Sequence, residues 1–174
     1  MEHRLALVSD VDRIMAIIGD AQRFLKDSGV DQWQNGYPTS EIYKEDIEKG
    51  CCHIFTVEGR VAGVISVYFE KEECYNVVCD GKWLTGDAQY ALFHRAAVGR
   101  EYRGMGIAGQ MLSFAENMAL EHGYKSIRGD THRDNKAMRG LLEKRGFVPC
   151  GTIYLNGIMD AKNERVCYEK LLKA

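Results

Sequence analysis

Glycines and arginines gather in one short stretch, residues 98–109, which reads VGREYRGMGIAG. An apolar run, residues 89–98, leads into it, and a helical pattern begins at Ile107. Glycines let a backbone approach a ligand closely, and a helix N-terminus offers unpaired N–H groups with a partial positive charge. Arg103 adds a permanent charge. The stretch therefore predicts a binding site for a phosphate or a pyrophosphate.

The letters GMGIAG within this stretch also fit the G-x-G-x-x-G pattern of dinucleotide-binding turns. In a Rossmann unit the first glycine follows the strand almost directly, whereas residues 99–103 separate Val98 from Gly104 here. The pattern ends at residue 109 of 174, which leaves too little chain for the remaining strand–helix units. A Rossmann-type nucleotide binder is therefore the weaker interpretation, and a glycine-rich turn without a ligand is a third.

His94 is a candidate general base on the apolar run 89–98. An imidazole titrates near neutral pH, which suits it to take a proton from an amine. On a regular strand His94 shares a face with Val98, at the entrance to the glycine turn. The alternative is a hydrogen-bonded structural histidine, and a bulge would turn the side chain to the other face.

These features resemble the GCN5-related N-acetyltransferase (GNAT) family. The family signature Q/R-x-x-G-x-G/A is matched by residues 103–108, and its backbone amides hold the pyrophosphate of acetyl-CoA. A second stretch from Asn135 to Phe147 resembles the family's N-x-x-A-x-x-L-Y-x-x-x-G-F motif, with Met138 at the Ala and Leu142 at the Tyr position. The resemblance extends over essentially the whole chain.

The resemblance implies an acetyl-CoA-dependent N-acetyltransferase that transfers the acetyl group directly to a primary amine of a small molecule or a protein. It places Trp33 and Tyr37, in the loop 31–40, over the acceptor pocket, where an ordinary surface loop is the alternative. It assigns the oxyanion donor to a backbone N–H near Val98. The cofactor contacts that it implies are Val98, Arg103, Gly104, Met105, Gly106, Ile107, Ala108 and Asn135.

The general acid is in doubt, because Leu142 cannot donate a proton where many relatives carry a tyrosine. Tyr154 and Tyr168, on the last two predicted strands, are the candidate acids, with core packing as the alternative for each. A thiolate is a weak base, so it could also leave unaided. The missing tyrosine motivates a second hypothesis, a non-catalytic acyl-CoA-binding regulatory module.

Asp130 ends a predicted strand, 124–130, at the end where α/β sites usually open. It is a candidate for orienting a cationic amine or His94. Helix capping is the alternative for this polar segment, because Asp134 directly precedes the next predicted helix.

Hydrophobic periodicity predicts the elements that position these residues. Alternating or continuously apolar runs predict strands at 3–8, 51–57, 61–69, 89–98, 124–130, 147–154 and 164–171. Helical spacing predicts helices at about 9–27, 40–50, 107–122 and 135–145, with Ser9 and Ser40 as N-caps. Together with the resemblance, this order predicts an α/β (α+β) fold with a mixed, mostly antiparallel central sheet flanked by helices on both faces.

The composition suits one globular domain, residues 1–174, with 45% hydrophobic and 28% charged residues. A net charge of −2 argues against nucleic acid or a membrane surface as partner. The six cysteines form no CxxC pair, so we expect no metal site. No uncharged apolar run is long enough to cross a membrane, and the N-terminal stretch is not typical of a signal peptide, so we expect a cytoplasmic location with free thiols. A homodimer is an open alternative, since nothing in the sequence specifies an interface.

Overall fold

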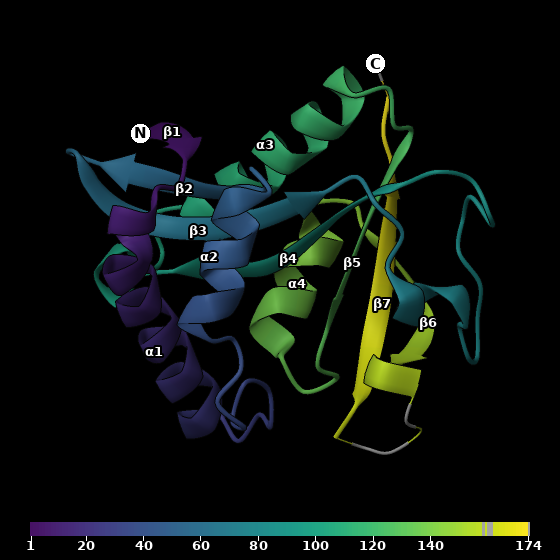
Figure 1. The fold of residues 1–174 in the computed structure, drawn as a ribbon. Coiled ribbons are helices and arrows are strands. Elements are labelled where there is room, and N and C mark those ends of the chain that lie inside the picture. Colours follow the sequence, from purple (N-terminus) through teal and green to yellow (C-terminus); the bar gives the residue numbers. More distant parts are fainter. Residues whose placement is uncertain (158, 160–161, 174) are drawn as a thin grey trace. The chain divides into compact units, whose positions relative to one another are not determined.

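The computed structural model describes residues 1–157, 159 and 162–173, and Figure 1 shows its fold. The chain forms two compact units, which are described separately. The first comprises Met1–Tyr68 and Phe93–Ala115, and the second comprises Phe69–Leu92 and Glu116–Ala174. The helices are α1 (Val11–Asp27), α2 (Ser40–Glu48), α3 (Ile107–Glu121) and α4 (Lys136–Lys144). The strands are β1 (Glu2–Leu5), β2 (Cys52–Val57), β3 (Arg60–Tyr68), β4 (Ala91–Val98), β5 (Ser126–Thr131), β6 (Val148–Tyr154) and β7 (Glu164–Leu171).

The strands follow the hydrogen-bonded order β1-β2-β3-β4-β5-β7-β6. The pairs β1–β2, β2–β3, β5–β7 and β6–β7 are antiparallel, whereas β4 and β5 are parallel. Strand β4 belongs to both units, because Ala91 and Leu92 pair with β5 and the rest of the strand lies in the first unit. The predicted mixed, mostly antiparallel sheet with flanking helices is thus confirmed.

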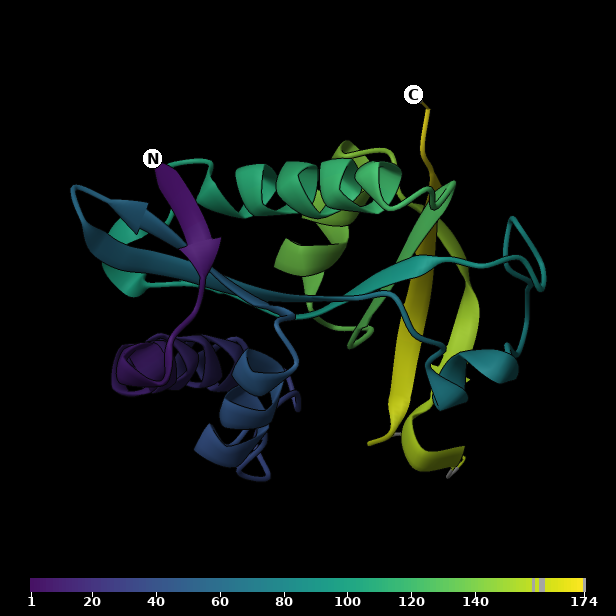
Figure 2. The same ribbon diagram turned by 45° about the horizontal axis from the view of Figure 1, so that its top comes forward.

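In the first unit, α1 and α2 lie on one face of the sheet and the beginning of α3 lies on the other (Figure 2). The apolar stripe of α1 forms the core on its side, with Ile14, Ile17 and Ile18 fully buried against β2 and β3. On the opposite face, a Cβ at Gly63 would lie 2.7 Å from Sδ of Met111. Glycine at this position of β3 therefore allows α3 to approach the sheet.

The second unit packs α4 and the segment 69–90 around β5, β6 and β7. Arg128 on β5 is only 2% exposed and pairs with the buried Glu169 on β7, with 3.1 Å between Nε and Oε1. The guanidinium carbon lies 4.1 Å from the ring centroid of Trp83 and 3.9 Å from that of Tyr90. Glu169 also accepts the backbone N–H of Leu84 at 2.6 Å. These contacts fasten the polar, turn-rich segment before β4 to the sheet.

The helix starts differ from the predicted caps by one residue. Helix α1 follows a 3-10 turn, η1 (Val8–Asp10), and its N-cap is Asp10 rather than Ser9. The carboxylate of Asp10 does not cap α1, because it accepts the N–H of Leu7 at 2.8 Å and the guanidinium of Arg4. Helix α2 is capped by Thr39, whose hydroxyl accepts the N–H of Ile42, rather than by Ser40.

Candidate active site

The glycine turn lies entirely in the first unit, between the end of β4 and the start of α3. Gly104 and Gly106 have left-handed φ angles of 81° and 77°, which only glycine adopts without strain. A Cβ at either position would meet nothing within 4 Å, so the space above the backbone is open. The first helical hydrogen bond runs from the N–H of Gln110 to the carbonyl of Gly106. The N–H groups of residues 107–109 precede that bond and are suited to an anion such as a pyrophosphate.

Helix α1 braces this turn from the side. Arg13 pairs with Glu101 at 2.5 Å, and the N–H of Arg100 donates to Asp20 Oδ2 at 3.4 Å. Arg103 donates to the carbonyl oxygen of Asp20 at 2.9 Å, and its guanidinium carbon lies 4.8 Å from the ring centroid of Phe24. The positive charge that the sequence predicts beside the anion site is therefore held against α1 in this structure.

The strand that carries His94 is not regular. Arg95 has a left-handed φ of 52° within β4, which interrupts the alternation of side chains between the two faces. The face to which His94 points consequently does not follow from its spacing to Val98. In the structure the imidazole ring lies beside the phenol ring of Tyr68 on β3, with 5.7 Å between the centroids.

A buried ion pair lies next to His94. The side chains of Arg95 and Asp46 are 9% and 6% exposed, and Nη2 of Arg95 lies 2.6 Å from Oδ2 of Asp46. Tyr68 donates its hydroxyl to Oδ1 of the same carboxylate at 2.6 Å and also accepts from Arg95. Burial opposes the charge of Arg95, but Tyr37 and Asp46 outweigh burial and raise the pKa of its guanidinium.

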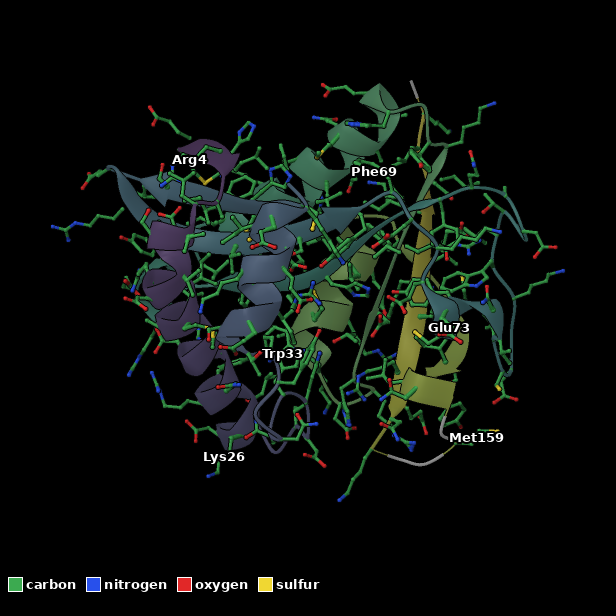
Figure 3. All side chains as sticks on the ribbon, viewed as in Figure 1. Arg4, Lys26, Trp33, Phe69, Glu73 and Met159 are labelled. Atoms are coloured by element: carbon green, nitrogen blue, oxygen red, sulfur yellow. The ribbon has the colours of Figure 1, made fainter. Side chains whose placement is uncertain are left out.

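The predicted acceptor loop reaches this ion pair through Tyr37, whose hydroxyl accepts from Nη1 of Arg95 at 2.8 Å. Trp33 lies in the loop between α1 and α2 (Figure 3), where it packs against the core of the first unit. Its left-handed φ of 63° is unusual for a residue with a large side chain. The structure thus links a predicted acceptor residue, Tyr37, to the strand of the candidate base.

Sequence reasoning missed Arg95, Asp46 and Tyr68. Arg95 did leave a signal, because an arginine inside the apolar run 89–98 must find a buried partner. Asp46 left a weaker signal in the sequence. It lies three residues after the buried Tyr43, and this spacing places both side chains on the inward face of α2. Neither signal identifies the partner.

In the second unit, the predicted polar residues at the end of β5 are bound by neighbours. The carboxylate of Asp130 accepts the hydroxyl of Tyr75 at 2.7 Å. Asn135 is the N-cap of α4, and its side chain accepts the N–H of Met138 at 3.1 Å. The cap that the sequence considered for Asp134 therefore belongs to Asn135.

The candidate acids also lie in the second unit. Tyr168 on β7 donates its hydroxyl to Glu143 at 2.9 Å and accepts from Nε of Arg139 at 3.0 Å, both on α4. Burial raises the pKa of Tyr168, and the bond to Glu143 adds to that rise against the opposing effect of Arg139. Leu142 is fully buried in the core, and Tyr154 ends β6 in a half-buried position.

The buried cysteine thiols of β2 and β7 and of the residue before β2 are not suited to nucleophilic chemistry. All six are free, and burial raises the pKa of Cys51, Cys52 and Cys167 to about 12. Among the described residues, no group of three or more histidine, cysteine, aspartate or glutamate side chains is arranged to hold a metal ion. In the same part of the chain, every helix is too short or too polar to cross a membrane.

Comparisons with known proteins agree on one family. The model of the acetyltransferase (GNAT) family matches residues 20–147. A GNAT-family acetyltransferase from Streptococcus agalactiae is 31% identical with a TM-score of 0.88, over 99% of this chain and 96% of that one. A GNAT-family acetyltransferase from Listeria monocytogenes is 25% identical with a TM-score of 0.73, over 98% and 94% of the two chains. A ribosomal-protein-alanine N-acetyltransferase from Brucella melitensis shares the fold, with 19% identity, a TM-score of 0.70 and coverage of 99% and 100%. No curated protein matches the sequence significantly.

Proposed function

Because the chain belongs to the acetyltransferase (GNAT) family, we propose that it is an N-acetyltransferase that moves the acetyl group of acetyl-CoA directly to a primary amine. The acceptor is a small molecule or a peptide. The observation that carries the proposal is the glycine turn, where two left-handed glycines and the start of α3 leave an open row of N–H groups. We extend it to residues 1–174 as one acetyltransferase domain, supported by the 99% coverage of the Streptococcus agalactiae likeness. The six free thiols support a cytoplasmic location as part of the proposal.

Binding of acetyl-CoA is assigned to the chain's own backbone. The N–H groups of Gly106, Ile107 and Ala108 hold the pyrophosphate, since they carry the partial positive charge of the helix N-terminus. The N–H near Val98 donates to the thioester carbonyl. Asn135 contacts the pantetheine arm or acts through α4, whose first turn it caps.

In the proposed reaction, the amine nitrogen attacks the thioester carbon and forms the new C–N bond. His94 takes the proton that the amine loses. A preorganised N–H near Val98 stabilises the oxyanion of the tetrahedral intermediate, an effect typically worth about 3–4 kcal/mol. The C–S bond then breaks, and the electron pair leaves with the CoA sulfur as a thiolate, which takes a proton from water to become the thiol. Trp33, Tyr37 and Asp130 are assigned to the acceptor.

We propose that the thiolate leaves without a dedicated acid. A thiol titrates near pH ~8.5, so protonation of the leaving group gains little near neutral pH. The proton of Tyr168 is already donated to Glu143, which argues against its transfer to sulfur. Tyr154 is the remaining candidate, since Leu142 has no proton to give.

The test is a panel of amine acceptors incubated with acetyl-CoA, with release of CoA thiol as the readout. The panel contains polyamines, amino acids, aminoglycosides and peptides with free N-termini. Thiol release that depends on one amine, with the acetylated amine identified by mass spectrometry, supports direct transfer. Tight binding of acetyl-CoA without transfer to any amine would favour the regulatory module that Leu142 motivates. Absence of acetyl-CoA binding would overturn both.

A further inference from the structure

Arg95 is a buried cation of the first unit that reaches a predicted acceptor residue, Tyr37. Its side chain is 9% exposed, and its guanidinium contacts a loop, a helix and a strand. Nη1 donates to Tyr37 in the loop 31–39, and Nη2 donates to Asp46 on α2 and to Tyr68 on β3. A guanidinium presents several donors in a fixed planar arrangement, which a lysine ammonium on a flexible chain does not reproduce.

The carboxylate of Asp46 accepts three hydrogen bonds inside this cluster. Oδ2 accepts from Arg95 at 2.6 Å and from the hydroxyl of Ser66 at 2.7 Å, and Oδ1 accepts from Tyr68. A carboxylate with three internal donors is poorly suited to bind a cationic amine. Its role in the structure is to neutralise and orient Arg95, because a buried guanidinium without a counter-ion is strongly destabilising.

The loop 31–39 is also attached to the helices on either side of it, since Thr39 caps α2 and two glutamine side chains bond along α1. Gln22 donates to the carbonyl of Tyr37 at 3.1 Å, and Gln34 donates to the carbonyl of Gln22 at 3.0 Å. Arg95 supplies a contact to β4, the strand of His94. Through the hydroxyl of Tyr37, β4 thus restrains the loop, while the residue itself stays 37% exposed.

We propose that Arg95, with Asp46 as its counter-ion, is a positioning residue that fastens the loop 31–39 to β4 and so sets the shape of the acceptor site. The ion pair holds the guanidinium in place, and the guanidinium holds Tyr37. The restraint on the loop follows from the contacts of Arg95 with Tyr37 and Asp46. The effect of that restraint on the acceptor site rests on the proposed function. The two statements are therefore tested by separate measurements.

The first measurement is hydrogen–deuterium exchange of the ligand-free protein, followed by mass spectrometry of peptides that cover residues 31–39. Tyr37→Phe removes the hydroxyl that Arg95 binds, and we expect exchange in this loop to rise about tenfold with the rest of the first unit unchanged. Tyr43→Phe is the matched control. It removes a buried hydroxyl in the same cluster that has no hydrogen-bond partner among the described residues, so loop exchange should stay at the parent value. Equal exchange in the parent and Tyr37→Phe would overturn the proposal.

The second measurement separates acceptor binding from acetyl-CoA binding. With the best amine of the acceptor panel, Tyr37→Phe should raise the KM for the amine about tenfold, with kcat changed less and the Kd for acetyl-CoA unchanged. Arg95→Lys keeps the charge opposite Asp46 but loses the planar set of donors, and it should reproduce the KM effect. An unchanged KM in both variants would overturn the role at the acceptor site. If no amine is acetylated, the proposed function fails, and loop exchange alone decides whether Arg95 fastens the loop.

Discussion

His53 on β2 makes the fold sensitive to acid. The residue is 5% exposed, its ring lies 4.8 Å from that of Phe114, and its Nε2 has no hydrogen-bond partner among the described residues. Burial, with a smaller contribution from the nearby His3, lowers the pKa of His53 from 6.5 to about 4. The native protein therefore keeps this imidazole neutral at pH values where an exposed histidine is charged.

The direction of the pH effect follows from proton binding. Between pH 6.5 and about 4, His53 binds a proton in the unfolded chain but stays neutral in the native protein. The free energy of unfolding therefore falls as the pH falls. The full effect of this one group is about 3 kcal/mol, and about 2 kcal/mol of it lies between about pH 7.5 and about pH 5. That is a large share of the ~5–15 kcal/mol that stabilises a typical protein.

The assay is urea denaturation of the parent and of His53→Phe at about pH 7.5 and about pH 5. Phenylalanine keeps an aromatic ring against Phe114 and cannot titrate. We expect the parent to lose about 2 kcal/mol more than the variant over this range, whatever their difference at neutral pH. His3→Gln should weaken the dependence without removing it, because one charge that keeps His53 neutral is gone. If His53→Phe and the parent lose the same stability on acidification, the reasoning is refuted.

Three further predictions concern the proposed reaction. Gly106→Val should abolish acetyl-CoA binding in calorimetry, whereas Gly123→Val, which carries the same strain of a left-handed φ (82°) at the end of α3, should leave binding intact. His94→Ala should lower the transfer rate by about two to four powers of ten with the affinity for acetyl-CoA unchanged; a parental rate would make the histidine structural. Tyr168→Phe should change the chemical rate by less than about tenfold, and a hundredfold loss with intact acetyl-CoA affinity would identify Tyr168 as the acid.

The elements of the fold were predictable because each leaves a local pattern. The stripe that includes Ile14, Ile17 and Ile18 repeats at helical spacing, and α1 ends at Asp27 as predicted. Cap positions were less predictable, since Asp10 could have bonded forward to α1 and instead bonds back to Leu7. The start of β4 shifted to Ala91 because strand ends depend on pairing with distant residues.

The glycine turn was predictable for a related reason. Left-handed backbone conformations favour glycine, so the residue types at positions 104 and 106 already indicate a turn. Arg95 departs from that preference, because it adopts a left-handed φ without being glycine. The left-handed φ at Arg95 in β4, and with it the orientation of His94, therefore does not follow from the residue types.

Arg95 and Arg128 each interrupt an apolar strand, and the partners of their side chains differ. A buried charge costs several kcal/mol unless it is compensated, so both positions had to have partners. Arg128 lies between two aromatic rings and pairs with Glu169, which is 0% exposed, so every contact ends inside the second unit. Arg95 pairs with Asp46, 49 residues away, but its other end binds the half-exposed Tyr37, 58 residues away. Arg128 also donates to the carbonyl oxygen of the exposed Gly86 at 2.8 Å, so an exposed partner alone does not distinguish the two arginines. The identity of the partner does, because Tyr37 is a predicted acceptor residue and none of the partners of Arg128 is. That difference is the reason to propose a site role for Arg95 and a role in the fold for Arg128.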